Sequence, residues 1–158
     1  MGVSMASGPF TFAELARAAG VRIEEARTYR DRGLLQPPRR RRGRGDDIAF
    51  YAEHLERLRF IRCALGYGFS LQAVAMLVDG KSLGTCNDVY RVAVTQLEEL
   101  RRDRGPAHPT VLALQRLIET CSARGSRTSC KILATLSAEA TTPLKQTMAW
   151  RVSYRTDP

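Results

Sequence analysis

A glycine and two prolines interrupt a long stretch of helical spacing, and this interruption limits the fold more than any other feature of the chain. Apolar residues recur at helical intervals from residue 89 to 100 and again from 112 to 118. They are Val89, Val92, Val94, Leu97 and Leu100 in the first stretch, and Leu112, Leu114, Leu117 and Ile118 in the second. The segment GPAHP occupies 105–109 between them. A proline inside a helix costs about 3 kcal/mol or more, so the sequence predicts a kink or a break here.

Helix-capping residues and glycines divide the first third of the chain into short helices. Thr11 and Glu14 form a capping box that opens a helix over 12–19, which Gly20 ends. A second helix is predicted over 23–31, ending at Gly33. Two short helices joined by a turn that contains glycine are typical of a helix-turn-helix.

The following segment predicts a wing and two more helices. The loop over 36–50 has the composition of a two-stranded wing. A helix over 52–66 has a buried stripe at three- to four-residue spacing, formed by Leu55, Leu58, Ile61 and Leu65. Ser70 caps a further helix over 71–78. His54 is expected on the surface of the helix over 52–66.

Positive charge is concentrated next to the predicted second helix. The chain carries a net charge of +9, and residues 22–44 contain nine arginines against three carboxylates, a local net charge of +6. The arginine fork suits phosphates and guanine edges, although a basic run is also compatible with a solvated loop or with binding to RNA, acidic proteins or membrane surfaces. The candidate DNA-binding residues are Arg22, Arg27, Tyr29, Arg30, Arg40, Arg41, Arg42, Arg44 and Tyr51.

Four stretches together resemble the MerR-type metal-responsive transcription regulators. They read FTFAELARAAGV, ARTYRDRGLL, HLERLRFIRCALGYGFSLQAVAML and CSARGSRTSC, and the resemblance covers roughly residues 10–136. It implies a mainly α fold, with an N-terminal winged helix-turn-helix, a long dimerisation helix and a short C-terminal metal-binding loop. It also implies a homodimer on double-stranded promoter DNA, which distorts the promoter on metal binding so that RNA polymerase can engage it.

The resemblance divides the chain into five segments. We expect a flexible N-terminus over 1–9, a winged helix-turn-helix DNA-binding domain over 10–80, a dimerisation helix over 81–120, a metal-binding loop with a short helix over 121–137, and a tail over 138–158. The wing departs from the family pattern, because Ala49 and Phe50 stand before Tyr51 where two arginines are usual. Arg22 stands where a serine or threonine helix cap is common.

Cys86, Cys121 and Cys130 are the candidate metal ligands. Any one of them alone would be read as a small buried hydrophobe, but Cys121 and Cys130 bracket the polar loop SARGSRTS, where inert core thiols would be out of place. Thiolates favour soft metals, and three sulfurs suit mercury or lead better than zinc, which usually takes four ligands. The spacing and loop sequence resemble the mercury-sensing branch, so Hg(II) is expected, with Pb(II), Zn(II) and Cd(II) as alternatives. Arg124 and Arg127 are expected to lower the pKa of the thiols.

The path of the chain between these cysteines decides where a site can form. A continuous helix over 86–121 would place its ends about 50 Å apart, so Cys86 could not reach Cys121 of the same chain. The antiparallel dimer implied by the resemblance would instead place Cys86 beside the partner's loop. If the break at 105–109 folds the chain back, Cys86 approaches Cys121 within one chain, and the geometry no longer requires a dimer.

The favoured function is therefore a cytoplasmic, metal-sensing, DNA-binding activator. A regulator that responds to thiol redox state, through a disulfide between Cys121 and Cys130, is the alternative. No nucleophile–base pair, phosphate-binding glycine loop or zinc-hydrolase motif is present, so we do not expect an enzyme. No run of about 20 apolar residues is present, so we do not expect a membrane span. Cys63 is assigned to the core.

Overall fold

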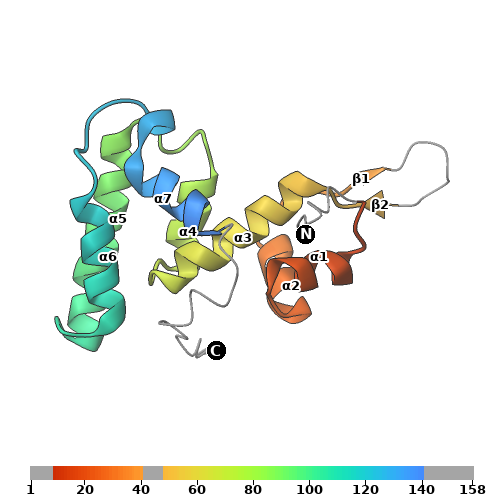
Figure 1. Ribbon diagram of the computed structural model, residues 1–158, viewed down its shortest axis with the longest axis horizontal. Helices are drawn as coiled ribbons and strands as arrows, with labels where there is room; N and C mark the ends of the chain where they lie inside the picture. Colours follow the sequence, from red (N-terminus) through yellow and green to blue (C-terminus); the bar gives the residue numbers. More distant parts are fainter. Residues whose placement is uncertain (1–8, 41–47, 141–158) are drawn as a thin grey trace, which may run out of the picture. The chain divides into compact units, whose positions relative to one another are not determined.

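The computed structural model describes residues 9–40 and 48–140, and this part of the protein is mainly helical (Figure 1). The chain divides into two compact units, residues 1–60 and residues 61–158. The division falls within helix α3 (Ala52–Gly66). Among the described residues, no helix is both long enough and apolar enough to cross a bilayer.

Helices α1 (Phe12–Ala19) and α2 (Ile23–Asp31) pack together in the first unit and have the predicted bounds. The capping box of α1 is confirmed, because the Glu14 N–H donates to Thr11 Oγ1 and the Thr11 N–H donates to Glu14 Oε2. At the N-terminus of α2 the cap residue is Arg22, and the hydrogen-bond acceptor at this end of the helix is supplied by Glu25. Its carboxylate accepts from the Arg22 N–H at 3.3 Å and pairs with the Arg22 guanidinium at 2.9 Å.

A small antiparallel wing follows, formed by β1 (Arg39–Arg40) and β2 (Ile48–Ala49). Arg39 pairs with Ala49 and Arg40 pairs with Ile48. The chain before α1 adds to this region, because Phe10 and Phe50 exchange two backbone hydrogen bonds of 2.7 and 3.0 Å. The wing predicted over 36–50 is thus confirmed where the structure describes it.

The expected surface position of His54 is wrong. Its side chain is only 1% exposed and connects the start of α3 to Pro37, just before β1. Nδ1 accepts from the Tyr51 N–H at 2.9 Å, and Nε2 lies 3.0 Å from the Pro37 carbonyl oxygen. A carbonyl can only accept, so Nε2 carries the proton. Buried polar groups are satisfied by hydrogen bonds, and both ring nitrogens have partners here.

The second unit contains α4 (Leu71–Val78), α5 (Cys86–Arg104), α6 (Pro109–Glu119), a 3₁₀ turn η1 (Arg127–Ser129) and α7 (Lys131–Ala140). Helices α5 and α6 run side by side in opposite directions (Figure 1). The predicted break is confirmed, since α5 ends at Arg104 and α6 begins at Pro109. Of the two alternatives left by the sequence, the chain folds back as a hairpin.

Gly105 and His108 make the hairpin turn. Gly105 has φ 86° and ψ 156°, a conformation that residues with a Cβ rarely adopt. Its carbonyl accepts from the His108 N–H at 3.3 Å. The His108 side chain then caps α6 by accepting from the Thr110 N–H, and Pro109 occupies the first turn, where a missing N–H is tolerated.

The buried face of the hairpin differs in part from the predicted one. Val89, Leu97 and Leu100 of α5 are buried, as are Val111, Leu114, Leu117 and Ile118 of α6. Val92 and Val94 are only half-buried, and Leu112 is 41% exposed. Ala93 and Gln96 take the inward positions on α5. Val92 and Val94 were predicted on one face with Val89 and Leu97, but at 3.6 residues per turn they lie to either side of the buried Ala93.

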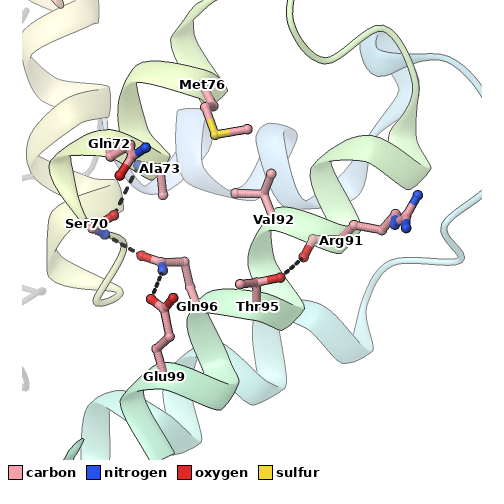
Figure 2. Close-up of a pocket in the computed structure, with 9 residues that line it drawn as sticks. All are labelled: Ser70, Gln72, Ala73, Met76, Arg91, Val92, Thr95, Gln96 and Glu99. Atoms are coloured by element: carbon pink, nitrogen blue, oxygen red, sulfur yellow. Dashed lines mark hydrogen bonds between the residues drawn. The ribbon is translucent and has the colours of Figure 1, made fainter.

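Gln96 joins α5 to the start of α4 (Figure 2). Its side chain is buried, with Oε1 accepting from the Ser70 N–H at 2.6 Å and Nε2 donating to Glu99 at 2.5 Å. Ser70 in turn caps α4, because its Oγ accepts from the Ala73 N–H at 3.1 Å. The buried amide therefore fixes where α4 begins relative to α5.

Candidate metal centre and nucleic-acid interface

The three candidate cysteines converge in a single chain. The Sγ atoms of Cys86, Cys121 and Cys130 all lie within 4.8 Å of one another, and those of Cys86 and Cys121 are 3.2 Å apart. Cys86 and Cys130 are 2% and 1% exposed, while Cys121 is half-buried. Among the described residues, the cluster with three or more potential ligand atoms contains only these thiols. The hairpin removes the geometric need for a partner chain.

Each cysteine stands at the end of a helix. Cys86 is the first residue of α5, Cys121 follows the last residues of α6, and Cys130 directly precedes α7. Helix α5 begins at Cys86 because Thr85 and Asp88 form a capping box, in which the Asp88 N–H donates to Thr85 Oγ1 at 3.2 Å. This T-x-x-D signal is readable in the sequence, although the start of α5 was not among the predicted helix caps.

Backbone contacts hold the loop between Cys121 and Cys130 beside the start of α5. The Cys86 N–H donates to the Gly125 carbonyl at 3.1 Å, and Thr85 forms an isolated β-bridge with Ser126. Within the loop, Ala123 adopts φ 56°, a left-handed conformation that costs roughly 1–2 kcal/mol without glycine. Its N–H donates to Cys121 Sγ at 3.4 Å. The loop thus has a strained residue next to a candidate ligand, as functional sites often do.

The electrostatics at Cys86 differ from the expectation. Burial, followed by hydrogen bonding with the other two thiols, raises the pKa of Cys86 to about 12. The expected lowering by loop arginines does not apply to this thiol, because the Arg127 guanidinium donates instead to the carbonyls of Leu77 and Leu83. Cys86 is therefore a neutral thiol at pH 7, and binding of a metal would have to displace its proton.

The donor set fits a thiophilic ion. Three sulfurs held about 2.3 Å from an ion in a trigonal plane would lie about 4 Å apart, close to the separations found here. Thiolates favour soft metals, and three sulfurs without a histidine or carboxylate suit an ion that accepts three-coordination. Cys63 takes no part in the cluster. It is half-buried on α3, and burial raises its pKa to about 12.

The candidate DNA-binding arginines on α2 are exposed. Arg22, Arg27 and Arg30 all face solvent, as does Arg40 in β1. Arg30 pairs with Asp31 at 3.2 Å, and its guanidinium carbon lies 4.9 Å from the centre of the Phe12 ring. Within the described residues no ion pair is found for Arg27, so its guanidinium is more available than those of Arg22 and Arg30.

The remaining candidates divide by burial and by position. Tyr29 is 7% exposed, which favours a packing role over direct contact with a base. Tyr51 is half-buried before α3. Arg41, Arg42 and Arg44 lie outside the described residues, as does the tail from residue 141 onwards. The exposed candidates within the described residues are thus spread over α2 and the wing.

Comparisons with known proteins, by family profile, by sequence and by structure, all find regulatory proteins. The sequence profile described as "MerR HTH family regulatory protein" matches residues 10–81. The chain is 31% identical over 131 residues to the mercuric resistance operon regulatory protein of Shigella flexneri, covering 82% of this chain and 89% of that protein. The corresponding protein of Serratia marcescens is 32% identical over 130 residues, with 82% and 88% covered.

A solved structure is also similar. The transcription regulator PbrR691 from Ralstonia metallidurans, solved in complex with lead(II), is 25% identical. It superposes with a TM-score of 0.52, covering 80% of this chain and 98% of that chain. The winged helix-turn-helix and the cysteine region therefore both lie within the part of the chain that has known relatives.

Proposed function

Because the chain belongs to the MerR family of helix-turn-helix transcription regulators, whose members are not enzymes, we propose that it senses a thiophilic metal ion. Cys86, Cys121 and Cys130 bind the ion, with Hg(II) favoured over Pb(II), Zn(II) and Cd(II). The relatives named as mercuric resistance regulators support Hg(II), and the relative solved with lead(II) supports Pb(II) as the main alternative. In this proposal the protein acts in the cytoplasm as a homodimer on promoter DNA. Metal binding makes it distort the promoter so that RNA polymerase can engage it and transcription is activated.

The observation that carries the proposal is the convergence of three sulfurs from three helix ends within 4.8 Å. Burial keeps two of these thiols away from competing solvent ligands. The high pKa of Cys86 implies that metal uptake releases a proton, so the apparent affinity should rise with pH. A buried, neutral Cys86 thiol is well suited to an ion whose bond to sulfur is strong enough to displace its proton.

We propose further that each chain forms a complete site by itself. The hairpin turn at Gly105 brings the end of α6 back to the start of α5, so that Cys121 lies beside Cys86. Dimerisation is then required for reading two half-sites on DNA, not for assembling the ligands. A symmetric homodimer would have two such sites.

DNA binding is assigned to α2 and the wing. The exposed Arg27 and Arg30 present cations along α2, and Arg22 presents another at the N-terminal cap of this helix. Helix α2 is the second helix of the helix-turn-helix, and the second helix enters the major groove in this class of motif. Arg40 places a further cation on the wing, and we retain Arg41, Arg42 and Arg44 as candidate phosphate contacts. Half-buried Tyr51 and buried Tyr29 would act mainly by holding these elements in place.

A metal titration tests the sensing proposal. Purified protein is titrated with Hg(II), Pb(II), Zn(II) and Cd(II), and thiolate-to-metal absorption in the ultraviolet is compared with transcription from the promoter. We expect one Hg(II) per chain, with both signals lost in the Cys86→Ser, Cys121→Ser and Cys130→Ser variants. Cys63→Ser is the matched control and should behave as wild type. A triple variant that still responded to mercury would overturn the assignment.

Mixed variants test whether the site lies within one chain. Cys86→Ser is co-refolded with a chain carrying both Cys121→Ser and Cys130→Ser, so that no single chain keeps all three thiols. An intrachain site predicts no three-sulfur absorption from the mixture. A site shared between protomers would instead restore one complete site in each mixed dimer, and that result would contradict the intrachain proposal.

The 3.2 Å separation between the sulfurs of Cys86 and Cys121 favours a second candidate, a response to thiol oxidation. This pair differs from the Cys121–Cys130 disulfide considered from the sequence. Two sulfurs this close need to approach by only about 1 Å to reach the disulfide bond length. Counting free thiols before and after mild oxidation, together with promoter transcription, separates this function from metal sensing.

A further inference from the structure

Arg127 lies in the loop that joins Cys121 to Cys130. Its half-buried side chain points towards α4 and not towards the three sulfurs. The guanidinium donates to the Leu77 carbonyl in the last turn of α4 and, at 3.3 Å, to the Leu83 carbonyl. Its backbone stays with the cluster, because the Arg127 carbonyl accepts from the Cys130 N–H at 3.2 Å. One residue therefore contacts both the cysteine loop and α4.

The contact with α4 provides a hydrogen-bond donor and a positive charge at the C-terminal end of that helix. The last carbonyls of a helix have no partners within it, and a cation there interacts favourably with the helix dipole. Helix α4 has no basic residue in its own last turn. Hydrogen bonds from Ser82 and the Lys81 backbone lower the pKa of Asp79, and the charge of Arg127 contributes to the same shift. The guanidinium thus supplies the positive charge that α4 lacks.

The two carbonyls lie at opposite ends of the connection between α4 and α5. Leu77 precedes this connection, and Leu83 lies just before the Thr85 cap that starts α5 at Cys86. The planar fork of arginine can donate to both carbonyls at once, which an ammonium group cannot do with the same geometry. The matched family profile extends to residue 81 and so includes all of α4. Arg127 therefore connects the cysteine loop to α4, at the C-terminal end of the segment that the family profile matches.

We propose that Arg127 is a positioning residue that transmits occupancy of the three-cysteine site to α4. The inference rests on the proposed metal-sensing function. Binding of an ion restrains the Cys121–Cys130 loop, and the loop carries the Arg127 fork with it. The fork then sets the geometry of the last turn of α4 and of the connection to Cys86. Without the fork, the loop can close on a metal while α4 no longer follows.

The test compares Arg127→Ala and Arg127→Lys with wild type, and uses Arg124→Ala as the matched control, since Arg124 is an exposed arginine of the same loop. Three quantities are measured on the full chain with Hg(II): metal affinity, metal-dependent induction of transcription, and amide hydrogen exchange of residues 71–86 with and without the ion. The first reports the site, and the other two report its connection to α4.

For Arg127→Ala we expect metal affinity within about tenfold of wild type, with induction reduced roughly tenfold or more, in the range of ordinary coupling between sites. Metal-dependent protection of residues 71–86 should disappear. Arg127→Lys should recover part of both responses, and Arg124→Ala should match wild type.

Wild-type induction and protection in Arg127→Ala would overturn the inference, and so would an equal loss in Arg124→Ala. A loss of metal affinity as complete as in Cys86→Ser would also overturn it, because Arg127 would then only build the site. If Arg127→Ala does not fold, Arg127→Lys decides by the same criteria. A failure of the proposed function itself appears separately, as a wild-type chain that binds no metal.

Discussion

Replacement of Gly105 by alanine changes stability in a direction that depends on the path of the chain after α5. In a continuous helix, glycine is about 1 kcal/mol less favourable than alanine, so Gly105→Ala would raise the free energy of unfolding. In the hairpin, Gly105 has φ 86° and ψ 156°. An alanine held there costs about 1–3 kcal/mol in backbone strain.

The structure allows the size of this effect to be estimated. No heavy atom lies within 4 Å of a Cβ built at Gly105, so strain acts without a steric clash. Reduced freedom of the unfolded chain offsets about 0.4–1 kcal/mol of the strain. We therefore expect a net destabilisation of about 1–2 kcal/mol, which separates the hairpin from the continuous helix by sign as well as by size.

Urea and thermal unfolding, followed by far-ultraviolet circular dichroism at fixed protein concentration, measure the change. For a unit of about 100 residues, each kcal/mol moves the thermal midpoint by about 4–8 °C. Gly84→Ala is the control, since Gly84 has neither a positive φ nor a neighbour within 4 Å of its Cβ position. If Gly105→Ala raised the midpoint as Gly84→Ala is expected to do, the hairpin turn would be refuted.

Three further predictions follow from local contacts. Gly68→Ala should destabilise more than Gly105→Ala, by about 2 kcal/mol or more, because its Cβ would lie 2.5 Å from Leu100 Cδ1 at φ 90°; the same unfolding measurements check it. The metal-free protein should lose stability as pH rises above 9. The folded state keeps the Cys86 proton up to a pKa of about 12, whereas the unfolded chain releases it near pH 9. Thermal midpoints measured between pH 7 and 11 should therefore fall less in Cys86→Ala than in wild type. Arg27→Ala should weaken promoter binding and reduce the slope of log affinity against log salt by about 1, measured by fluorescence anisotropy.

Each of these predictions has a result that contradicts it. Gly68→Ala as stable as wild type would mean that Leu100 does not occupy the position described. An identical alkaline transition in Cys86→Ala would remove Cys86 as a source of the pH dependence. For DNA binding, Arg116→Ala on α6 is the control, and an equal loss of salt dependence there would indicate a general charge effect.

Helix boundaries in the first unit were predictable because their signals are local. The Thr11–Glu14 capping box and Gly20 define α1, and a glycine past the end of α2 stops that helix. A cap and a stop require only residues that are a few positions apart, and their hydrogen bonds form within one turn. Such signals remain valid whatever the rest of the chain does.

Buried polar residues were not predictable in the same way. His54 was expected on the surface, and Gln96 was not recognised as buried, yet both lie in the interior with hydrogen-bond partners distant in sequence. For example, Gln96 accepts from Ser70, which lies 26 positions away. Only the packed structure brings such partners together, and a polar residue is stable inside only when they are present.

The composition of the candidate site and the interruption at 105–109 follow from the sequence alone, because thiol chemistry and the missing N–H of proline are properties of single residues. The direction taken after the interruption, and with it the union of Cys86 and Cys121 in one chain, depends on side-by-side packing of α5 and α6. Burial in that packing also reverses the expected pKa shift of Cys86. Packing and desolvation arise from residues far apart in the chain, so no local pattern encodes them.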